Sequence, residues 1–251
     1  MSYPNEPDKH AGKAVITPEA AIAYLDGDPE AVPDSIVLCY HDGLFEHARE
    51  RSVREIEGTF GECHALDGTD NEVGVVGEFG IGAPVTAITM ESLVVRGAKR
   101  FVSVGHVGSL DPGVGIGDLV VCDRAVRDEG TSYHYVESER YAAASPPLVE
   151  ALCAGLDTAG ETYERGATWT TDAVYRETIE EVETYREEGV LTVDMEAAAT
   201  FAIAAHRGVE AGALFTVSDY LDPPDWEPRF AETLPHLRRA FDLAVRALDR
   251  D

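Results

Sequence analysis

Short apolar runs, rich in valine and isoleucine, alternate along the chain with amphipathic stretches. Runs of this kind, bounded by Gly, Asp or Ser, predict β-strands. They cover residues 35–40, 73–79, 100–105, 118–123, 189–194 and 212–219. Because the runs are almost continuously apolar, both faces of these strands are expected to be covered by other elements.

Helical periodicity falls between and after these strands. The pattern over 84–96 begins at a proline and ends just before a glycine, which are helix start and stop signals. Further helices are predicted over 173–187, 195–206 and 234–248, the first of them the most polar. The predicted buried stripes are Val85, Ile88, Ser92 and Val95 in the helix at 84–96, and Leu237, Phe241, Ala244, Val245 and Leu248 in the last helix.

Strands that alternate with helices predict an α/β fold, in the form of a single-domain three-layer sandwich. Helices are expected to flank a central mixed, largely parallel β-sheet. No Pro/Ser-rich linker and no shift in composition divides the 251 residues, so one domain over 1–251 is predicted. Ligands of such sheets usually bind in the loops after the carboxyl ends of the strands.

The charge balance is strongly acidic, with 47 Asp and Glu against 20 Lys and Arg and a formal net charge of -27. This argues against nucleic-acid and membrane partners, because binding to phosphate backbones or anionic lipid needs clustered cations. Carboxylates spread along the whole chain, together with only three lysines, resemble the surfaces of proteins from salt-loving archaea. A halophilic protein is therefore expected.

The cysteines, Cys39, Cys63, Cys122 and Cys153, lie far apart and lack the spacing of a zinc site. Free buried thiols are expected, and no metal site is predicted. The N-terminal segment has no apolar leader pattern and no run of apolar residues is long enough to span a membrane. The expected location is the cytoplasm.

Two glycine-rich segments after predicted strands can present backbone amides to an anion. "GEFGIGAP" at 77–84 leads into a helix, so the amide of Gly80 lies near a helix N-terminus. "VGHVGSLDPGVGIGDLVV" at 104–121 includes Gly108 and again follows a strand. Tight turns without a ligand are the alternative interpretation of both segments.

Two acidic segments also follow predicted strands. In "VDMEAAA", Glu196 can accept hydrogen bonds from vicinal hydroxyls while Met195 gives an apolar floor, or the carboxylate can simply stabilise the helix dipole. In "TVSDYLD", a partly desolvated Asp219 can act as a general acid, or the Ser-Asp pair can form a turn.

Taken in order, these segments resemble the nucleoside phosphorylase superfamily, which includes purine nucleoside phosphorylase, uridine phosphorylase and the nucleosidases. The resemblance covers roughly residues 70–245. Its most specific pieces are "FGIGAP", "ESLVVRGAKRFVSVGHVGSLDPGVGIGDLVV", "VRDEGTSYHY", "TTDAVYRET", "VDMEAAA" and "VSD".

The resemblance implies an α/β sandwich and phosphorolysis of the N-glycosidic bond of a purine nucleoside or uridine, giving free base and ribose 1-phosphate. Inorganic phosphate is then the co-substrate and no other cofactor is implied. The family is usually a homo-oligomer of dimer units, most often a hexamer. Residues 1–34 are then expected to form an extension that contributes to the neighbouring subunit's site.

The resemblance also implies residue roles. Asp219 is similar to the acid that protonates or hydrogen-bonds N7 of a leaving purine. The ribose would be held by Glu196 at its 2'- and 3'-hydroxyls, by Met195, and by His10 from a neighbouring subunit at its 5'-hydroxyl. The implied base-binding residues are Val174, Tyr175, Arg176 and Ser218, and the implied phosphate-binding residues are Gly80, Ser103, His106 and Gly108.

The chain departs from the family at the base and at the phosphate. The glutamine and arginine with which uridine phosphorylases bind uracil are absent, and Arg176 and Glu177 occupy that region, which favours a purine. Ser103 and His106 stand where uridine phosphorylases carry arginine and threonine. A phosphate dianion thereby loses its best bidentate partner.

Other arginines are available to compensate, namely Arg49, Arg51 and Arg54, for which surface ion pairing is the alternative role. If nothing compensates, water replaces phosphate and the protein is a nucleosidase. A catalytically silent nucleoside-binding relative is the third hypothesis.

Overall fold

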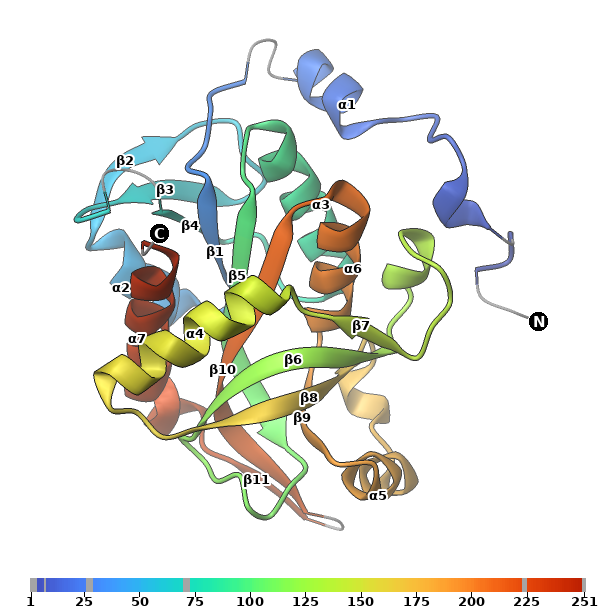
Figure 1. Cartoon of the computed structure of the whole chain (residues 1–251), viewed down its shortest axis with the longest axis vertical. Coiled ribbons are helices and arrows are strands. Elements are labelled where there is room, and N and C mark those ends of the chain that lie inside the picture. The colour runs from blue at the N-terminus through green and yellow to red at the C-terminus, as the bar shows by residue number, and fades with distance from the viewer. Residues whose placement is uncertain (1–3, 7, 26–28, 70–72, 223–224, 250–251) are drawn as a thin grey trace.

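A computed structural model describes residues 4–6, 8–25, 29–69, 73–222 and 225–249, and shows helices around one continuous mixed sheet (Figure 1). The helices are α1 (Pro18–Leu25), α2 (Asp42–Arg49), α3 (Ala83–Val95), α4 (Pro146–Ala159), α5 (Ile179–Glu187), α6 (Ala197–Arg207) and α7 (Phe230–Leu248). The strands are β1 (Ser35–Cys39), β2 (Ser52–Ile56), β3 (Glu62–Leu66), β4 (Val73–Gly77), β5 (Arg100–Ser109), β6 (Leu119–Asp128), β7 (Tyr141–Ala143), β8 (Tyr163–Thr171), β9 (Val190–Asp194), β10 (Glu210–Asp222) and β11 (Asp225–Pro228). Short 3-10 turns lie at η1 (Lys9–Ala11), η2 (Ser132–His134) and η3 (Val174–Arg176).

The sheet closes on itself. Its order is β11-β10-β6-β8-β9-β5-β1-β4-β3-β2, and β10 also pairs with β5, so that β10, β6, β8, β9 and β5 form a ring. Pairing is parallel from β4 through β1 and β5 to β10, and again from β6 through β8 to β9. It is antiparallel where these two groups meet and in the outer hairpins. The expected α/β fold with a central mixed sheet is confirmed.

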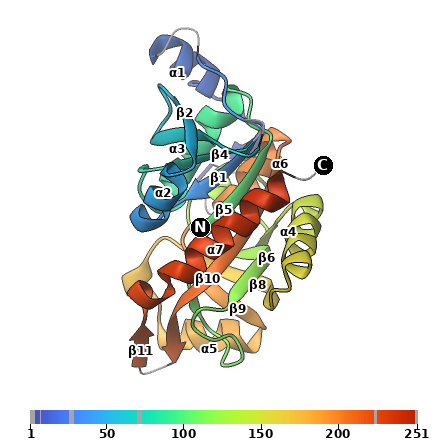
Figure 2. The same ribbon diagram turned by 90° about the vertical axis from the view of Figure 1, so that its left-hand side faces the viewer.

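Helices flank this sheet in two groups (Figure 2). Contacts join α3 to α6 in one group, and join α2 and α4 to α7 in the other. The predicted face of α7 is buried as expected, with Leu237, Phe241, Ala244, Val245 and Leu248 in the core. All four cysteines are free and buried, which confirms the expected free buried thiols.

The predicted buried face of α3 is wrong. Ile88 is 53% exposed and Val85 only half-buried, whereas Thr86, Met90 and Leu93 lie in the buried face. Apolar residues occur all around this helix, so its sequence alone does not indicate which face is buried. The buried face includes the small residues Ala83 and Ala87, and α3 packs against α6.

Several predicted strands are longer than the apolar runs, and one predicted helix is interrupted. β5 continues to Ser109, so Gly105 and Gly108 lie inside this strand and not in a loop. β10 starts at Glu210, two residues before the predicted strand.

The predicted helix over 173–187 is divided into η3 and α5. The division falls at Thr178, whose side chain accepts from the backbone N–H of Glu181 in a capping box that begins α5.

The carboxyl end of β4 shows why a glycine is needed there. A Cβ atom on Gly77 would lie 2.4 Å from the ring of Phe45, which is itself buried beneath the strand. This close contact lets α2 pack directly on β4. In the following loop, the ring of Phe79 meets that of Tyr40 after β1, with centroids 5.2 Å apart.

Candidate active site

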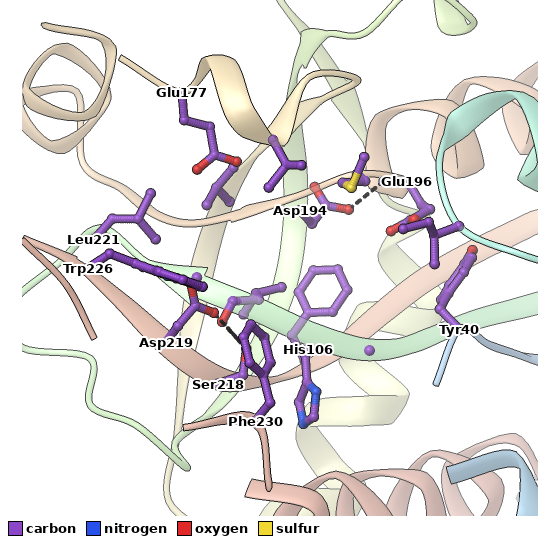
Figure 3. A pocket seen from close by; sticks show the side chains of 18 of the residues that line it. Tyr40, His106, Glu177, Asp194, Glu196, Ser218, Asp219, Leu221, Trp226 and Phe230 are labelled. Atoms are coloured by element: carbon purple, nitrogen blue, oxygen red, sulfur yellow. Dashed lines mark hydrogen bonds between the residues drawn. The ribbon is translucent and has the colours of Figure 1, made fainter. Parts of the chain in front are cut away.

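A cavity of about 730 Å³ lies where the carboxyl ends of β5, β9 and β10 meet, the position at which ligands usually bind in such sheets (Figure 3). The structure brings most of the predicted site residues together here. Those that line the cavity are Ser103, His106, Gly108, Val174, Tyr175, Met195, Glu196, Ser218 and Asp219.

Glu196 lies at the start of α6, and its Oε1 accepts a hydrogen bond of 2.6 Å from the backbone N–H of Gly82. Burial, and secondarily the negative charge of Asp194, raises the pKa of Glu196 to about 8. The glycine-rich loop before α3 therefore supports this carboxylate directly. The amide expected to bind phosphate, that of Gly80, does not belong to the cavity lining, and Gly80 is exposed with a φ of 92°.

Asp219 lies in the last third of β10, where two donors hold both of its carboxylate oxygens. The Ser218 hydroxyl donates to Oδ1 at 2.7 Å and the Trp226 indole N–H donates to Oδ2 at 2.8 Å. Gly108 is packed against this group, because a Cβ there would lie 3.2 Å from Asp219 Oδ2 and 2.4 Å from Leu221 Cδ1. The structure thus places Gly108 beside the carboxylate of Asp219.

The side chains of Ser103 and His106 bring one hydroxyl and one imidazole to the cavity wall. The ring of His41 meets that of His106 edge to face, with centroids 5.1 Å apart. Burial, and secondarily His41, lowers the pKa of His106 to about 4, so its ring is neutral near pH 7. The hydroxyl oxygens of Ser103 and Tyr40 lie 3.5 Å apart. Sequence reasoning missed Tyr40 and His41 as lining residues, although Tyr40 ends a predicted strand and His41 follows it directly.

Neither lysine nor arginine occurs among the described residues that line the cavity. The arginines considered as replacements form ion pairs elsewhere. Arg49 pairs with Glu62, Arg51 with Asp67 and Asp242, and Arg54 with Glu30. The structure therefore shows the alternative role of these three arginines, surface ion pairing, and not a place in the cavity lining.

In the segment before α5, the residues that line the cavity differ in part from those predicted to bind the base. Val174 and Tyr175 line the cavity but are 45% and 96% exposed. Arg176 is exposed and is not among the lining residues, whereas Glu177 projects into the cavity (Figure 3). The T-x-x-E capping pattern at Thr178 was the sequence signal that places Glu177 just before a helix.

His10 does not line the cavity of its own chain. It belongs to η1, which contacts η2 on the outside of the sheet. A role in a neighbouring subunit's site therefore stays a prediction.

In the part of the chain that the structure describes, no group of three His, Cys, Asp or Glu side chains is arranged to hold a metal ion. Within the same ranges, every helix is too short or too polar to cross a membrane.

Comparison with known proteins places the chain among characterised relatives. A family model described as Phosphorylase superfamily matches residues 21–250. The chain is 32% identical over 200 residues to a guanosine phosphorylase of Halorubrum lacusprofundi, covering 80% of this chain and 78% of that protein. It is 33% identical over 215 residues to a uridine phosphorylase of Thermococcus kodakarensis, covering 79% and 72%.

A solved structure of uridine phosphorylase from Vibrio fischeri ES114 superposes with a TM-score of 0.72 at 24% identity. The superposition covers 87% of this chain and 92% of that one. The two proteins share a fold.

Proposed function

Because the chain belongs to the phosphorylase superfamily, we propose that it cleaves the N-glycosidic bond of a nucleoside by phosphorolysis, giving free base and ribose 1-phosphate. The observation that carries the proposal is one cavity that holds both the Glu196 and the Asp219 carboxyl groups. Relatives named as guanosine and uridine phosphorylases support the same reaction class.

Glu196 and Met195 are proposed to hold the ribose. A carboxylate offers about four acceptor positions, so the bond from Gly82 leaves capacity for the 2'- and 3'-hydroxyls. As the glycosidic bond breaks, the sugar takes on oxocarbenium-like positive charge. An ionised Glu196 in a water-poor cavity stabilises that charge more in the transition state than in the ground state.

Asp219 is proposed to face the base, and a purine is the proposed base. Its carboxyl group is buried and oriented by Ser218 and Trp226, as expected for a group that must meet one ring atom. The leaving purine gains negative charge at N7, and a proton delivered there through Asp219 neutralises it.

Phosphate is proposed to bind near His41, Ser103 and His106, whose side chains can supply hydrogen-bond donors. The absence of arginine and lysine from the described lining residues favours a second candidate, hydrolysis by water. One assay separates them. The purified protein is incubated in high salt with guanosine, inosine, adenosine and uridine, with and without phosphate, and free base is measured.

Base release that requires phosphate supports phosphorolysis, and ribose 1-phosphate should accumulate in equal amount. Release that ignores phosphate, with free ribose as product, replaces it by hydrolysis. Nucleoside binding without release identifies a silent relative.

We also propose a homo-oligomer of dimer units, with a hexamer as the expected form. Large apolar side chains stand exposed on α1 and α3, namely Tyr24 at 88%, Leu25 at 75% and Ile88 at 53%. Since α1 packs on α3, these side chains lie on neighbouring helices and suit burial against a second copy. Sedimentation velocity in high salt tests this, and a monomer at assay concentrations overturns it.

A further inference from the structure

Tyr40 lines the cavity without serving any of the roles proposed for the ribose, the base or phosphate. It follows β1 directly and lies on the same side of the cavity as Glu196, away from Asp219 (Figure 3). Burial, and secondarily the negative charge of Glu196, raises the pKa of the Tyr40 phenol. A phenol that keeps its proton at neutral pH makes its contribution through packing and hydrogen bonds.

Tyr40 contacts the chain on both sides of Gly82. On one side its ring meets the ring of Phe79 edge to face, with centroids 5.2 Å apart. On the other side its hydroxyl lies 3.3 Å from that of Thr86, in the first turn of α3. The Thr86 hydroxyl has one proton, which it can donate to the Tyr40 oxygen or to the Gly82 carbonyl at 3.1 Å. The position of Gly82 is therefore tied to Tyr40.

Gly82 in turn supports Glu196. It has a φ of 99°, a conformation that glycine adopts without strain, and its N–H donates to Glu196 Oε1 at 2.6 Å. A hydrogen bond to a carboxylate favours the ionised form, so this bond opposes the burial that raises the pKa of Glu196. Hydrogen bonds weaken steeply when donor and acceptor are poorly aligned. A small displacement of the loop therefore changes how readily Glu196 ionises.

We propose that Tyr40 is a positioning residue, which holds the backbone N–H of Gly82 against the carboxyl group of Glu196. Its hydroxyl acts through Thr86 and its ring through Phe79. Because Tyr40 acts through the loop, its loss should change the ionisation of Glu196 and leave the groups that face the base in place. This inference rests on the proposed function, in which Glu196 holds the ribose.

The charged groups that act on Glu196 come from other elements. Asp194 at the end of β9 and Asp172 just after β8 both raise its pKa. In the described helices α3 and α6, the first turn carries no acidic side chain. The Tyr40 phenol is neutral, so Tyr40→Phe removes no charge. A changed ionisation of Glu196 in this variant therefore reports the position of the loop.

The test is Tyr40→Phe, which keeps the ring against Phe79 and removes only the hydroxyl. With the Gly82 N–H less well placed, the rise of kcat/KM with pH should occur about one pH unit higher than in the wild type. That displacement corresponds to a loss of about 10-fold in kcat/KM at pH 7. At pH values where Glu196 is ionised in both proteins, the two should converge. A loss that is equal at every pH overturns the inference, because general damage to the site does not depend on pH.

Two further variants test the contact itself. Thr86→Val removes the hydroxyl on the other side of the contact and should displace the rise in the same direction. Because both variants break one contact, Tyr40→Phe should add little in the Thr86→Val background, and two displacements that add fully contradict the inference. Tyr133→Phe is the matched control, since its hydroxyl also makes a hydrogen bond, to the Arg127 carbonyl at 2.6 Å, and Tyr133 does not line the cavity.

A measurement without turnover separates this inference from the proposed function. The free energy of unfolding falls with rising pH until Glu196 is ionised in the folded protein. In Tyr40→Phe this fall should extend about one pH unit higher, measured in urea at several pH values, while Tyr133→Phe should follow the pH dependence of the wild type. The same pH dependence in Tyr40→Phe and the wild type overturns the inference even if nucleosides are cleaved. A wild type that cleaves no nucleoside overturns the proposed function, and the unfolding data still decide the role of Tyr40.

Discussion

The Oδ2 atom of Asp194 accepts hydrogen bonds from the backbone N–H groups of Glu196 and Ala197, at 2.9 and 2.6 Å. Its Oδ1 atom accepts from the Thr170 hydroxyl at 2.7 Å. Asp194 therefore ties the turn between β9 and α6 to the neighbouring strand β8. One buried carboxylate in this way sets the position of a second one, Glu196, at the cavity.

Asp194→Ala should destabilise the fold, because it leaves two buried N–H groups and one hydroxyl without their acceptor. The free energy of unfolding should fall by at least about 2 kcal/mol, measured in urea. Glu183→Ala, on the exposed face of α5, serves as the control and should change little. Equal stability of the two variants would show that the turn holds without Asp194.

Glu196 should give the reaction a dependence on pH near 8. Its pKa is raised to about 8 in the empty site, and only the ionised form accepts from both ribose hydroxyls. Below pH 8 substrate binding has to displace a proton, so kcat/KM should rise as pH increases through 8. Glu196→Gln should be at least about 100-fold slower and lose this rise, since a carboxamide does not titrate.

The Glu196 carboxyl should also make the free energy of unfolding fall as pH rises, whereas it makes kcat/KM rise. Between its ordinary pKa near 4.5 and its folded pKa of about 8, the folded protein holds a proton that the unfolded chain releases. Stability of the wild type therefore falls as pH rises through this range. Relative to the wild type, Glu196→Gln should gain on the order of a few kcal/mol between pH 5 and 8. Urea titrations at several pH values measure the difference, and parallel curves contradict the prediction.

Asp219→Asn should slow purine cleavage about 100-fold or more in kcat, the usual range for loss of a general acid. The carboxamide can keep one of the hydrogen bonds from Ser218 and Trp226, so the fold should be retained. Asp111→Asn is the matched control, because Asp111 serves a turn by accepting from Gly113. Unchanged turnover by Asp219→Asn removes this residue from the mechanism.

His106→Ala should raise the KM for phosphate about 10-fold and leave the KM for nucleoside nearly unchanged, because one hydrogen bond to a charged ligand is lost. Its pKa of about 4 keeps the ring neutral throughout pH 6–8, so the imidazole has one N–H to donate. His236→Ala, exposed on α7, is the control. A change confined to the nucleoside KM would place His106 outside the phosphate site.

Salt should favour phosphate turnover. A net charge of -27 repels an anionic co-substrate, and in the described lining residues no lysine or arginine offsets it. The screening length shrinks to about 3 Å at 1 M salt, so the repulsion becomes short-ranged. Raising KCl should therefore lower the KM for phosphate more than the KM for the neutral nucleoside. Maximal activity in dilute buffer counts against this view and against a halophilic protein.

The sequence predicted the strands whose apolar residues are continuous, but it did not reveal β8. Threonines form much of the buried end of that strand, and they satisfy their hydroxyls through specific partners. Thr168 donates to the carbonyl of Thr192 and Thr170 donates to Asp194. Because those partners are far away in sequence, a polar strand of this kind cannot be distinguished from a loop by its pattern.

The sequence predicted site residues best where they lie at or just after the end of a predicted strand. Asp219 ends one apolar run and Glu196 lies two residues after another, and both line the cavity. Arg176 and Glu177 lie in a connecting segment, where the direction of each side chain depends on the cap at Thr178. The sequence therefore located this segment correctly but selected Arg176, which is exposed and does not line the cavity.

The closed ring of strands divides the site into a fixed part and an exchangeable part. Glu196 and Asp219 follow or lie on strands of the ring, β9 and β10, so neither can shift without disturbing several paired strands. The segment at Val174, Tyr175 and Glu177, which lies outside the ring, also lines the cavity. Substitutions in that segment can reshape one wall of the cavity while the paired strands keep Glu196 and Asp219 in place, so this scaffold can vary its ligand without rebuilding its sheet.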